Sequence, residues 1–483
     1  MALSILATTT VLGLLTGGQV VAEAAQPTLA WQACADMVGF ECAFLTVPRD
    51  WNDPTRGDIQ VAMARHRSTG SSDQRIGSLF FNPGGPGGAG VASIAQAYSY
   101  LPETIKAQFD FVSWDPRGIG LTEPLQDCAS PDWGAPPATG PVDWDAIEDQ
   151  VRVLVREANE ECVAKNPGIA PYMGTMQVVR DLDAMRAAVG DDQLNYWAWS
   201  YGTRIGYTYA LSFPDRFRAI ILDGSATPYG STAAFAEGYG TAADPAVNML
   251  FQTQAGSEAA YRRSMDYLTQ QPLRLNASHS LTQWNVKRAL EAYIEFEAIY
   301  PTLARYLNDV ETAIYGDGKA QRNAKRRLLR MPGPSQLVVT GAPAFVECLD
   351  YADRPTAAEQ DAIAAQARQV APITGWYRGL LFAYACEGFT PTPEPVPTNF
   401  DIDWTARLLL LGATFDSQTP YKWTVAMSSA FKASRVVTYV GGQHVTFGQA
   451  GSRCVNGYAT RYLTTLALPA VDVTCPNAIP TGS

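Results

Sequence analysis

The stretch from Leu194 to Tyr209 constrains the fold of this chain more than any other. It begins as an apolar run typical of a buried strand, breaks at Ser200, and continues at once as a segment compatible with a helix. A serine at such a sharp turn is exposed above the edge of a sheet, and small residues must flank it because the two backbones pass closely. The flanking residues here are Ala198 and Gly202, and Ala198 replaces the glycine usual at that position. The pattern also fits an ordinary strand-to-helix turn, so the rest of the chain must decide.

Length and composition predict a large globular protein. The chain has 483 residues, of which 47% are hydrophobic and 17% charged, and this length allows two or three domains. Its net charge of −11 gives a surface that repels phosphate backbones and anionic lipid. We therefore expect no nucleic-acid partner and no membrane-surface partner.

The N-terminal residues 1–25 are typical of a secretory signal peptide. They are apolar and uncharged until Glu23, and Ala22-Glu23-Ala24 resembles a small-x-small cleavage site. No Lys or Arg precedes the apolar run, and a membrane anchor is the alternative interpretation. We expect a protein that is secreted to the extracellular space and is free of the membrane once the signal is removed.

Cysteine usage agrees with an oxidising compartment. None of the cysteines has the Cys-x-x-Cys spacing of zinc or redox sites, so disulfides are the simplest interpretation. Connectivity does not follow from sequence, and pairing of neighbours is a working hypothesis. The eight cysteines are Cys34, Cys42, Cys128, Cys162, Cys348, Cys386, Cys454 and Cys475. Asn276-Ala277-Ser278 is a glycosylation sequon in a polar stretch, although it could equally be unused.

A glycine-rich segment follows the strand predicted at residues 76–82. Residues 83–90 contain five glycines, a density that lets backbone N–H groups point into a cavity, as an oxyanion hole or a phosphate cradle requires. The segment lacks the Lys-Ser/Thr ending of a P-loop and the spacing of a dinucleotide site. A flexible loop is the alternative.

After the next strand, at residues 109–114, Asp115 and Arg117 are interpreted as structural because charged pairs at strand ends more often fix loops.

The pattern of the chain changes between residues 227 and 398. Strand-like runs become scarce, and helices are predicted at residues 257–269, 283–300, 303–315 and 357–368. Strands resume at 407–412 and 435–440. We therefore expect an α/β core formed by residues 26–226 and 399–483, with residues 227–398 as a helical cap inserted before the last strands.

A serine nucleophile needs a base and an orienting carboxylate, and the chain has three histidines. His66 precedes the glycine segment and His279 lies beside the sequon, whereas His444 follows a strand in a glycine-rich turn. Asp416 directly follows the strand at 407–412, and Asp401 and Asp403 would lie at the wrong end of that strand. The predicted triad is therefore Ser200, Asp416 and His444, in the chain order of α/β-hydrolases.

These motifs together resemble the secreted tripeptidyl aminopeptidase branch of the prolyl aminopeptidase family of serine α/β-hydrolases. The resemblance is carried by Asn82-Pro-Gly-Gly-Pro-Gly87, Asp115-Pro-Arg-Gly-Ile-Gly120, Ser200-Tyr-Gly-Thr203, Asp416-Ser-Gln-Thr-Pro420 and Gly442-Gln-His444. It implies a mostly parallel sheet of eight strands. It also implies an oxyanion hole formed by the backbone N–H groups of Gly85 and Tyr201. Ala198, and Phe389 where the family often has Trp, leave the substrate class open.

The resulting hypothesis is a serine exopeptidase that releases residues or short peptides from peptide N-termini through an acyl-enzyme, with no cofactor and no metal. An esterase, lactonase or amidase of secondary metabolism on the same fold is the alternative, since a triad is indifferent to the leaving group. A catalytically inactive binding protein is a third. The family resemblance implies acidic residues under the cap that hold the substrate's α-amino group. Glu291, Glu295 and Glu297 lie in one helix-like stretch, but such acids more often form a solvated face, and they are not assigned to the site. The sequence does not predict an oligomeric state.

Overall fold

The computed structural model describes residues 29–128, 130–228, 230–330, 339–398, 400 and 407–478. The predicted signal peptide lies outside the described residues. Among the residues that are described, none of the helices combines the length and apolar character needed to cross a membrane.

A single sheet of ten strands forms the centre of the core, in the order β1-β2-β3-β5-β4-β6-β7-β10-β11-β12. The strands from β5 to β12 in that order pair in parallel, and β1, β2 and β3 pair antiparallel. Their bounds are Gln32–Ala33, Glu41–Pro48, Asp58–His66, Gly77–Asn82, Phe109–Trp114, Leu194–Trp199, Phe217–Asp223, Leu409–Ala413, Arg435–Tyr439 and Val473–Cys475, for β1 to β7 and β10 to β12 in chain order. The expected number of eight strands was wrong because short edge strands, β1 and β12, extend the sheet on both sides.

The central strands are apolar throughout because helices cover both faces of the sheet. Alternate side chains enter different cores: Phe80 packs on one face, and its neighbours Leu79 and Phe81 pack on the other. Helices α4, α5 and α15 supply buried residues to the first face, and α1, α2 and α16 supply the second. Their bounds are Gly90–Tyr100 (α1), Glu103–Gln108 (α2), Thr175–Ala188 (α4), Gly202–Ser212 (α5), Tyr421–Ala430 (α15) and Arg453–Thr465 (α16).

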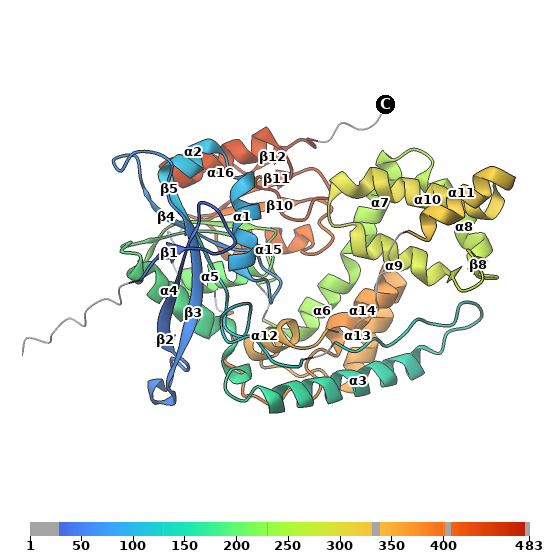
Figure 1. Ribbon diagram of the computed structural model, residues 1–483, viewed down its shortest axis with the longest axis horizontal. Helices are drawn as coiled ribbons and strands as arrows, with labels where there is room; N and C mark the ends of the chain where they lie inside the picture. The colour runs from blue at the N-terminus through green and yellow to red at the C-terminus, as the bar shows by residue number, and fades with distance from the viewer. Residues whose placement is uncertain are drawn as a thin grey trace, which may run out of the picture.

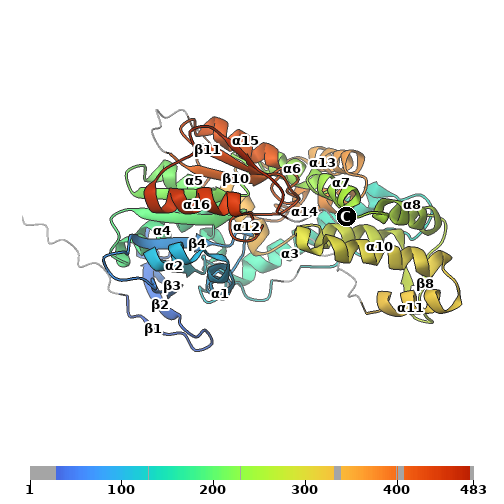
Figure 2. The same ribbon diagram turned by 90° about the horizontal axis from the view of Figure 1, so that it is seen from above.

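Helices α6 to α14 lie between β7 and β10 in the chain and form a body at one end of the sheet (Figures 1 and 2). We call this body the cap. Helices α7 to α11 have a hydrophobic core of their own. The bounds are Thr232–Thr241 (α6), Ala243–Thr253 (α7), Ser257–Leu268 (α8), Gln283–Tyr293 (α9), Tyr300–Tyr315 (α10), Gly318–Leu328 (α11), Ala342–Asp350 (α12), Ala357–Val370 (α13) and Gly375–Ala383 (α14), with a hairpin of β8 (Leu273–Arg274) and β9 (Ser280–Leu281).

Two features differ from the sequence-based expectations. The helix predicted at 283–300 ends at Tyr293, because the Glu295 carbonyl accepts a hydrogen bond from the His444 N–H and not from a helical neighbour. The 22-residue helix α3 (Trp144–Lys165), which includes Cys162, lies where the sequence patterns predicted no helix. This helix runs beside α13 (Figure 1), and Arg368 pairs with Glu148 at 2.5 Å. Two insertions therefore pack together here: the segment between β5 and β6, which contains α3, and the cap, between β7 and β10.

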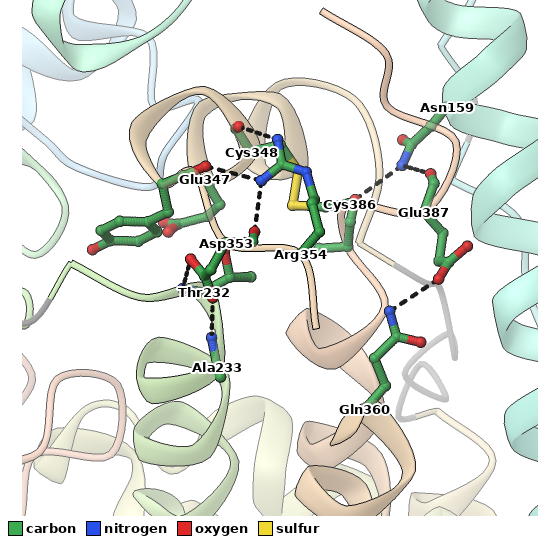
Figure 3. The surroundings of a disulfide bond; sticks show 12 residues. Asn159, Thr232, Ala233, Glu347, Cys348, Asp353, Arg354, Gln360, Cys386 and Glu387 are labelled. Carbon is green, nitrogen blue, oxygen red and sulfur yellow. Dashed lines mark hydrogen bonds between the residues drawn. A yellow bond between two sulfur atoms is a disulfide. The ribbon is translucent and has the colours of Figure 1, made fainter. Parts of the chain in front are cut away.

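The eight cysteines form four disulfides, each between consecutive cysteines of the sequence. The pairs are Cys34–Cys42, Cys128–Cys162, Cys348–Cys386 and Cys454–Cys475. Figure 3 shows the third pair, which joins α12 to the segment after α14. Beside it, Asn159 of α3 donates to the carbonyls of Ala385 and Glu387. Both insertions therefore meet at this disulfide.

Candidate active site

Ser200 occupies the turn between β6 and α5 in a strained conformation. Its φ of +54° lies in the left-handed region, which a residue with a side chain adopts only when the surroundings impose it. The Ser200 N–H donates to the carbonyl of Asp223 at 3.0 Å, which ties the turn to the end of β7. Such a strained serine between a strand and a helix has the backbone geometry of a nucleophile elbow.

Two glycines provide the close approach that this turn requires. A Cβ at Gly202 would lie 2.7 Å from Asn82 Oδ1 and 3.0 Å from the Cβ of Ala198. A Cβ at Gly84 would lie 2.5 Å from the carbonyl oxygen of Trp199. The methyl group of Ala198 is therefore accommodated because Gly202 has none, which accounts for the departure from the usual glycine.

His444 and Asp416 are in direct contact. Nδ1 of His444 lies 2.9 Å from both carboxylate oxygens of Asp416, and both side chains are buried. Asp416 Oδ1 also accepts the backbone N–H groups of Gln418 and Thr419, at 2.8 and 2.9 Å. The Thr419 hydroxyl donates to Asp416 Oδ2 at 3.0 Å. These donors fix the carboxylate, which in turn fixes the imidazole so that Nδ1 faces Asp416.

The surroundings of His444 favour its charged form. Burial alone would lower the pKa of His444, but the Asp416 carboxylate, by its charge and its hydrogen bond, raises it above the ordinary value, and Glu295 and Asp223 add to this. Asp223 accepts the backbone N–H groups of Thr446 and Phe447. Burial raises the pKa of Asp223 to about 6 despite these hydrogen bonds.

Ser200 and His444 line one cavity of about 340 Å³ between the core and the cap. Gly85 and Tyr201, the residues expected to supply oxyanion donors, line it too. Its wall is largely apolar: the aromatic residues are Trp199, Tyr201, Phe235, Tyr239, Phe296 and Phe382, and the other lining residues are Pro83, Gln96, Ala226, Glu295, Gln418, Thr419, Val445 and Gln449. The structure therefore brings the expected nucleophile, base and oxyanion-hole residues to one cavity, with Asp416 behind the base.

The three glutamates considered from the sequence, all of them in the cap, differ in their surroundings. Glu291 is paired with Arg378 at 2.9 Å and also with Arg288. Glu297 is buried, and Glu295 lines the cavity. Because α9 ends at Tyr293, the expectation that the three glutamates lie in one helix was wrong. Burial raises the pKa of the Glu295 carboxyl, although the nearby His444 opposes this.

Cap residues hold both loops that carry the base and its acid. The Gly442 N–H donates to Glu297 Oε1 at 2.6 Å, and the His444 N–H donates to the carbonyl of Glu295 at 2.9 Å. The buried Arg378 of α14 donates to the carbonyl of Ser417, next to Asp416. Sequence reasoning missed the roles of Arg378 and Glu297, because these contacts join distant segments.

Other residues considered from the sequence lie elsewhere. His66 stacks on Tyr98 with ring centroids 4.2 Å apart, and His279 lies in the β8–β9 hairpin beside the exposed Asn276. Asp115 accepts the N–H of Val91 at the start of α1. Arg117 forms a bidentate pair with Asp181, at 2.6 and 2.7 Å. Both charged groups fix loops, which supports their structural interpretation.

Comparison with known proteins places this chain in a family. A profile described as TAP-like protein matches residues 373–475, which include Asp416 and His444. Serine protease Hip1 of Mycobacterium tuberculosis is 30% identical over 471 residues, covering 90% of this chain and 87% of that protein. The chain belongs to the TAP-like family. This TAP-like protein is a serine hydrolase with the α/β-hydrolase fold.

Two further relatives of this TAP-like protein have names that refer to different reactions, peptide cleavage and ester cleavage. Tripeptidyl aminopeptidase of Streptomyces coelicolor is 28% identical over 498 residues, covering 95% of this chain and 88% of that protein. Carboxylesterase B of Mycobacterium tuberculosis is 27% identical over 494 residues, covering 93% and 90%. The TAP-like chain is thus similar along nearly its whole length to proteins with peptidase names and to one with an esterase name.

Proposed function

We propose that this protein is a secreted serine aminopeptidase that releases residues or short peptides from peptide N-termini. The observation that carries the proposal is Glu295, the one carboxylate among the cavity-lining residues that the structure describes. A carboxylate in a largely apolar cavity favours a cationic partner there, since an unpaired buried charge is costly. The protonated α-amino group of a peptide is such a partner.

The triad supplies the bond cleavage. Nε2 of His444 takes the hydroxyl proton of Ser200 as Ser200 Oγ attacks the carbonyl carbon, and Asp416 stabilises the imidazolium. The N–H groups of Gly85 and Tyr201 donate to the oxyanion, and each such donor contributes on the order of 3 kcal/mol to transition-state stabilisation. His444 then protonates the leaving amine. Water, deprotonated by His444, attacks the acyl-enzyme and releases the N-terminal fragment.

The role of Glu295 can be tested with paired substrates. Glu295→Gln keeps the shape of the side chain but removes its charge. We expect kcat/KM on aminoacyl and tripeptidyl amides with free amino groups to fall by one to two orders of magnitude, which corresponds to the loss of about 1.5–3 kcal/mol from a charge-assisted hydrogen bond. Activity on the N-acetylated forms of the same amides should change little.

Controls separate this role from general damage. Ser200→Ala should abolish turnover and fluorophosphonate labelling, and Glu258→Gln, in an exposed ion pair on α8, should leave both substrate series unchanged. Equal losses on free and acetylated substrates in Glu295→Gln would remove the amino-group role. Turnover by Ser200→Ala equal to that of the unaltered protein would remove the triad.

An esterase, lactonase or amidase is the second candidate. The similarity to carboxylesterase B and the aromatic wall of the cavity favour it. Purified protein assayed on short-chain acyl esters and on peptide amides distinguishes the two. Ester turnover without any peptide cleavage would replace the aminopeptidase proposal with this one.

The proposed route to the cell exterior is supported by the four disulfides, which persist in oxidising compartments. Residues 1–25 are proposed as the signal peptide and Asn276, exposed in its hairpin, as a glycosylation site. Residues 227–398 are proposed as the cap domain between core segments 26–226 and 399–483. N-terminal sequencing and mass measurement of protein from the culture medium would test the cleavage and the glycan.

A further inference from the structure

Both the backbone and the side-chain hydroxyl of Tyr201 are held in place. Its backbone directly follows the strained Ser200, and its buried ring extends away from the turn to a hydrogen bond between its hydroxyl and Thr175 Oγ1, at 2.7 Å. We propose that Thr175 is a positioning residue of the oxyanion hole, which holds the Tyr201 side chain and thereby fixes the direction of the Tyr201 N–H. The inference rests on the proposed function, in which that N–H donates to the oxyanion.

The direction of each hydrogen bond follows from the groups present. Thr175 Oγ1 donates its single proton to Asp350 Oδ2 at 2.6 Å. The Tyr201 hydroxyl must therefore be the donor to Thr175 Oγ1. The Thr175 N–H, at the start of α4, donates to the other carboxylate oxygen of Asp350 at 2.7 Å. Thr175 thus binds Asp350 with two hydrogen bonds and presents one acceptor to Tyr201.

Asp350 is itself held by a residue of α5, the helix that directly follows the nucleophile turn. The guanidinium of Arg204, on α5, lies 3.0 Å from Asp350 Oδ2 and 3.0 Å from Glu347 Oε2. All three side chains are buried, so removing one charge would leave the others uncompensated. The contacts form a closed path from Tyr201 through Thr175, Asp350 and Arg204 back to α5.

The backbone around Asp350 is also fixed. Cys348, two residues earlier, is bonded to Cys386, and its carbonyl accepts Arg354 at 2.6 Å (Figure 3). The Val396 N–H donates to the carbonyl of Asp350 at 3.0 Å. The carboxylate that anchors Thr175 therefore has little freedom to follow a movement of Tyr201.

This anchoring matters because Ser200 is strained. Relaxation of its φ would rotate the peptide group between Ser200 and Tyr201, and the N–H of that group is the proposed oxyanion donor. A residue held in the left-handed region keeps its conformation only where neighbouring contacts impose it. The Tyr201 ring, fixed at its hydroxyl, opposes the rotation. Loss of the anchor should weaken an interaction made in the transition state and leave substrate binding intact.

The experiment uses the full-length enzyme with three substitutions. Thr175→Val removes the hydroxyl at nearly constant shape, Thr175→Ser retains it, and Tyr201→Phe removes only the partner hydroxyl. The matched control is Thr208→Val, at a buried threonine of α5 whose hydroxyl has no hydrogen-bond partner among the described residues. Fluorophosphonate labelling, carried to completion, measures the concentration of active sites, so that kcat refers to folded enzyme.

We expect kcat per labelled site to fall roughly tenfold in Thr175→Val and Tyr201→Phe, less than the hundredfold or more that follows loss of a whole donor. KM should stay within about twofold, and affinity for a peptide boronic acid, which forms a tetrahedral adduct, should fall in parallel with kcat. Thr175→Ser should restore both values, and Thr208→Val should match the unaltered enzyme.

Two outcomes would overturn the proposal. One is an unchanged kcat per labelled site with fewer labelled sites, because that is the result of a purely structural role. The other is full activity in Tyr201→Phe, which does not depend on the folding of the threonine variants. Turnover without labelling at Ser200 would instead remove the underlying catalytic assignment, so the two failures are distinguishable.

Discussion

Glu297 of the cap accepts the backbone N–H of Gly442 at 2.6 Å, two residues before His444. The same carboxylate accepts Tyr439 Oη at 2.9 Å and Asn477 Nδ2 at 3.1 Å. A buried acidic group thus has three donors, one of which belongs to the loop that carries the proposed base. Glu297 therefore contacts that loop directly, and it is not among the described residues that line the cavity.

Glu297→Ala should therefore impair catalysis through His444. The change removes an acceptor from buried donors and should lower the free energy of unfolding by about 1–3 kcal/mol. We expect kcat/KM per folded molecule to fall about tenfold, because the loop is no longer held in one position. Denaturant unfolding and active-site titration measure the two effects. Unaltered kcat/KM per titrated site would show that the loop needs no such support.

Asp416→Asn should lower kcat by about 10⁴-fold with little change in KM, because an amide favours the wrong imidazole tautomer. Asp223→Asn is the informative comparison. Asp223 contacts backbone N–H groups of the histidine loop and not the ring, so we expect a much smaller loss of kcat. Steady-state kinetics of both variants decide the identity of the acid. A larger loss in Asp223→Asn would reverse the assignment.

Gly202→Ala should damage the turn, whereas Ala198→Gly should not. The added methyl at position 202 would meet Asn82 and Ala198 at 2.7 and 3.0 Å, and such overpacking costs about 1–3 kcal/mol. Ala198→Gly only adds backbone freedom to a strand, at about 0.5–1 kcal/mol. Thermal unfolding and fluorophosphonate labelling rates report on both. Rapid labelling of Gly202→Ala would contradict the steric account.

The dependence of kcat/KM on pH should differ between free and blocked substrates. His444 must be neutral to accept a proton. Because its pKa is raised, the acidic limb of the pH profile should lie above pH 6.5, the ordinary pKa of histidine. With free amino groups a second limb should appear near pH 8, where the α-amino group of the peptide loses its charge. N-acetylated substrates and Glu295→Gln should lack this limb. Identical profiles for both substrate series would exclude an ion pair with Glu295.

The order of strands, turns and helices along the sequence was sufficient to predict much of the core and the candidate triad. Ser200 follows a buried strand and precedes a helix, and Asp416 and His444 each follow a strand, so parallel pairing brings the three to one edge of the sheet. The sequence also contained an unused signal for α3: Glu148, Val151, Val155, Asn159 and Cys162 are buried at helical spacing. Its many charged residues and the preceding prolines obscured that pattern.

The cap contacts could not be predicted in this way. The end of α9 depends on a hydrogen bond from His444, about 150 residues later in the chain, and Arg378 reaches Ser417 from another helix. Such pairings depend on how the insertions pack on the core, and propensity or periodicity does not encode them. The same holds for Thr175 and Tyr201, which meet only because α4 and α5 cover the same face of the sheet.

The buried charges of the cap limit how this hydrolase can be recombined with its relatives. Arg378 and Glu297 reach the loops proposed to carry the acid and the base, and Asp350 pairs with Arg204 on α5, the helix that follows the proposed nucleophile. A cap transplanted from another hydrolase would bring different side chains to these positions and leave Arg204 without its carboxylates inside the protein. New specificity is therefore better engineered by changing the aromatic wall of the cavity than by exchanging the cap as a unit.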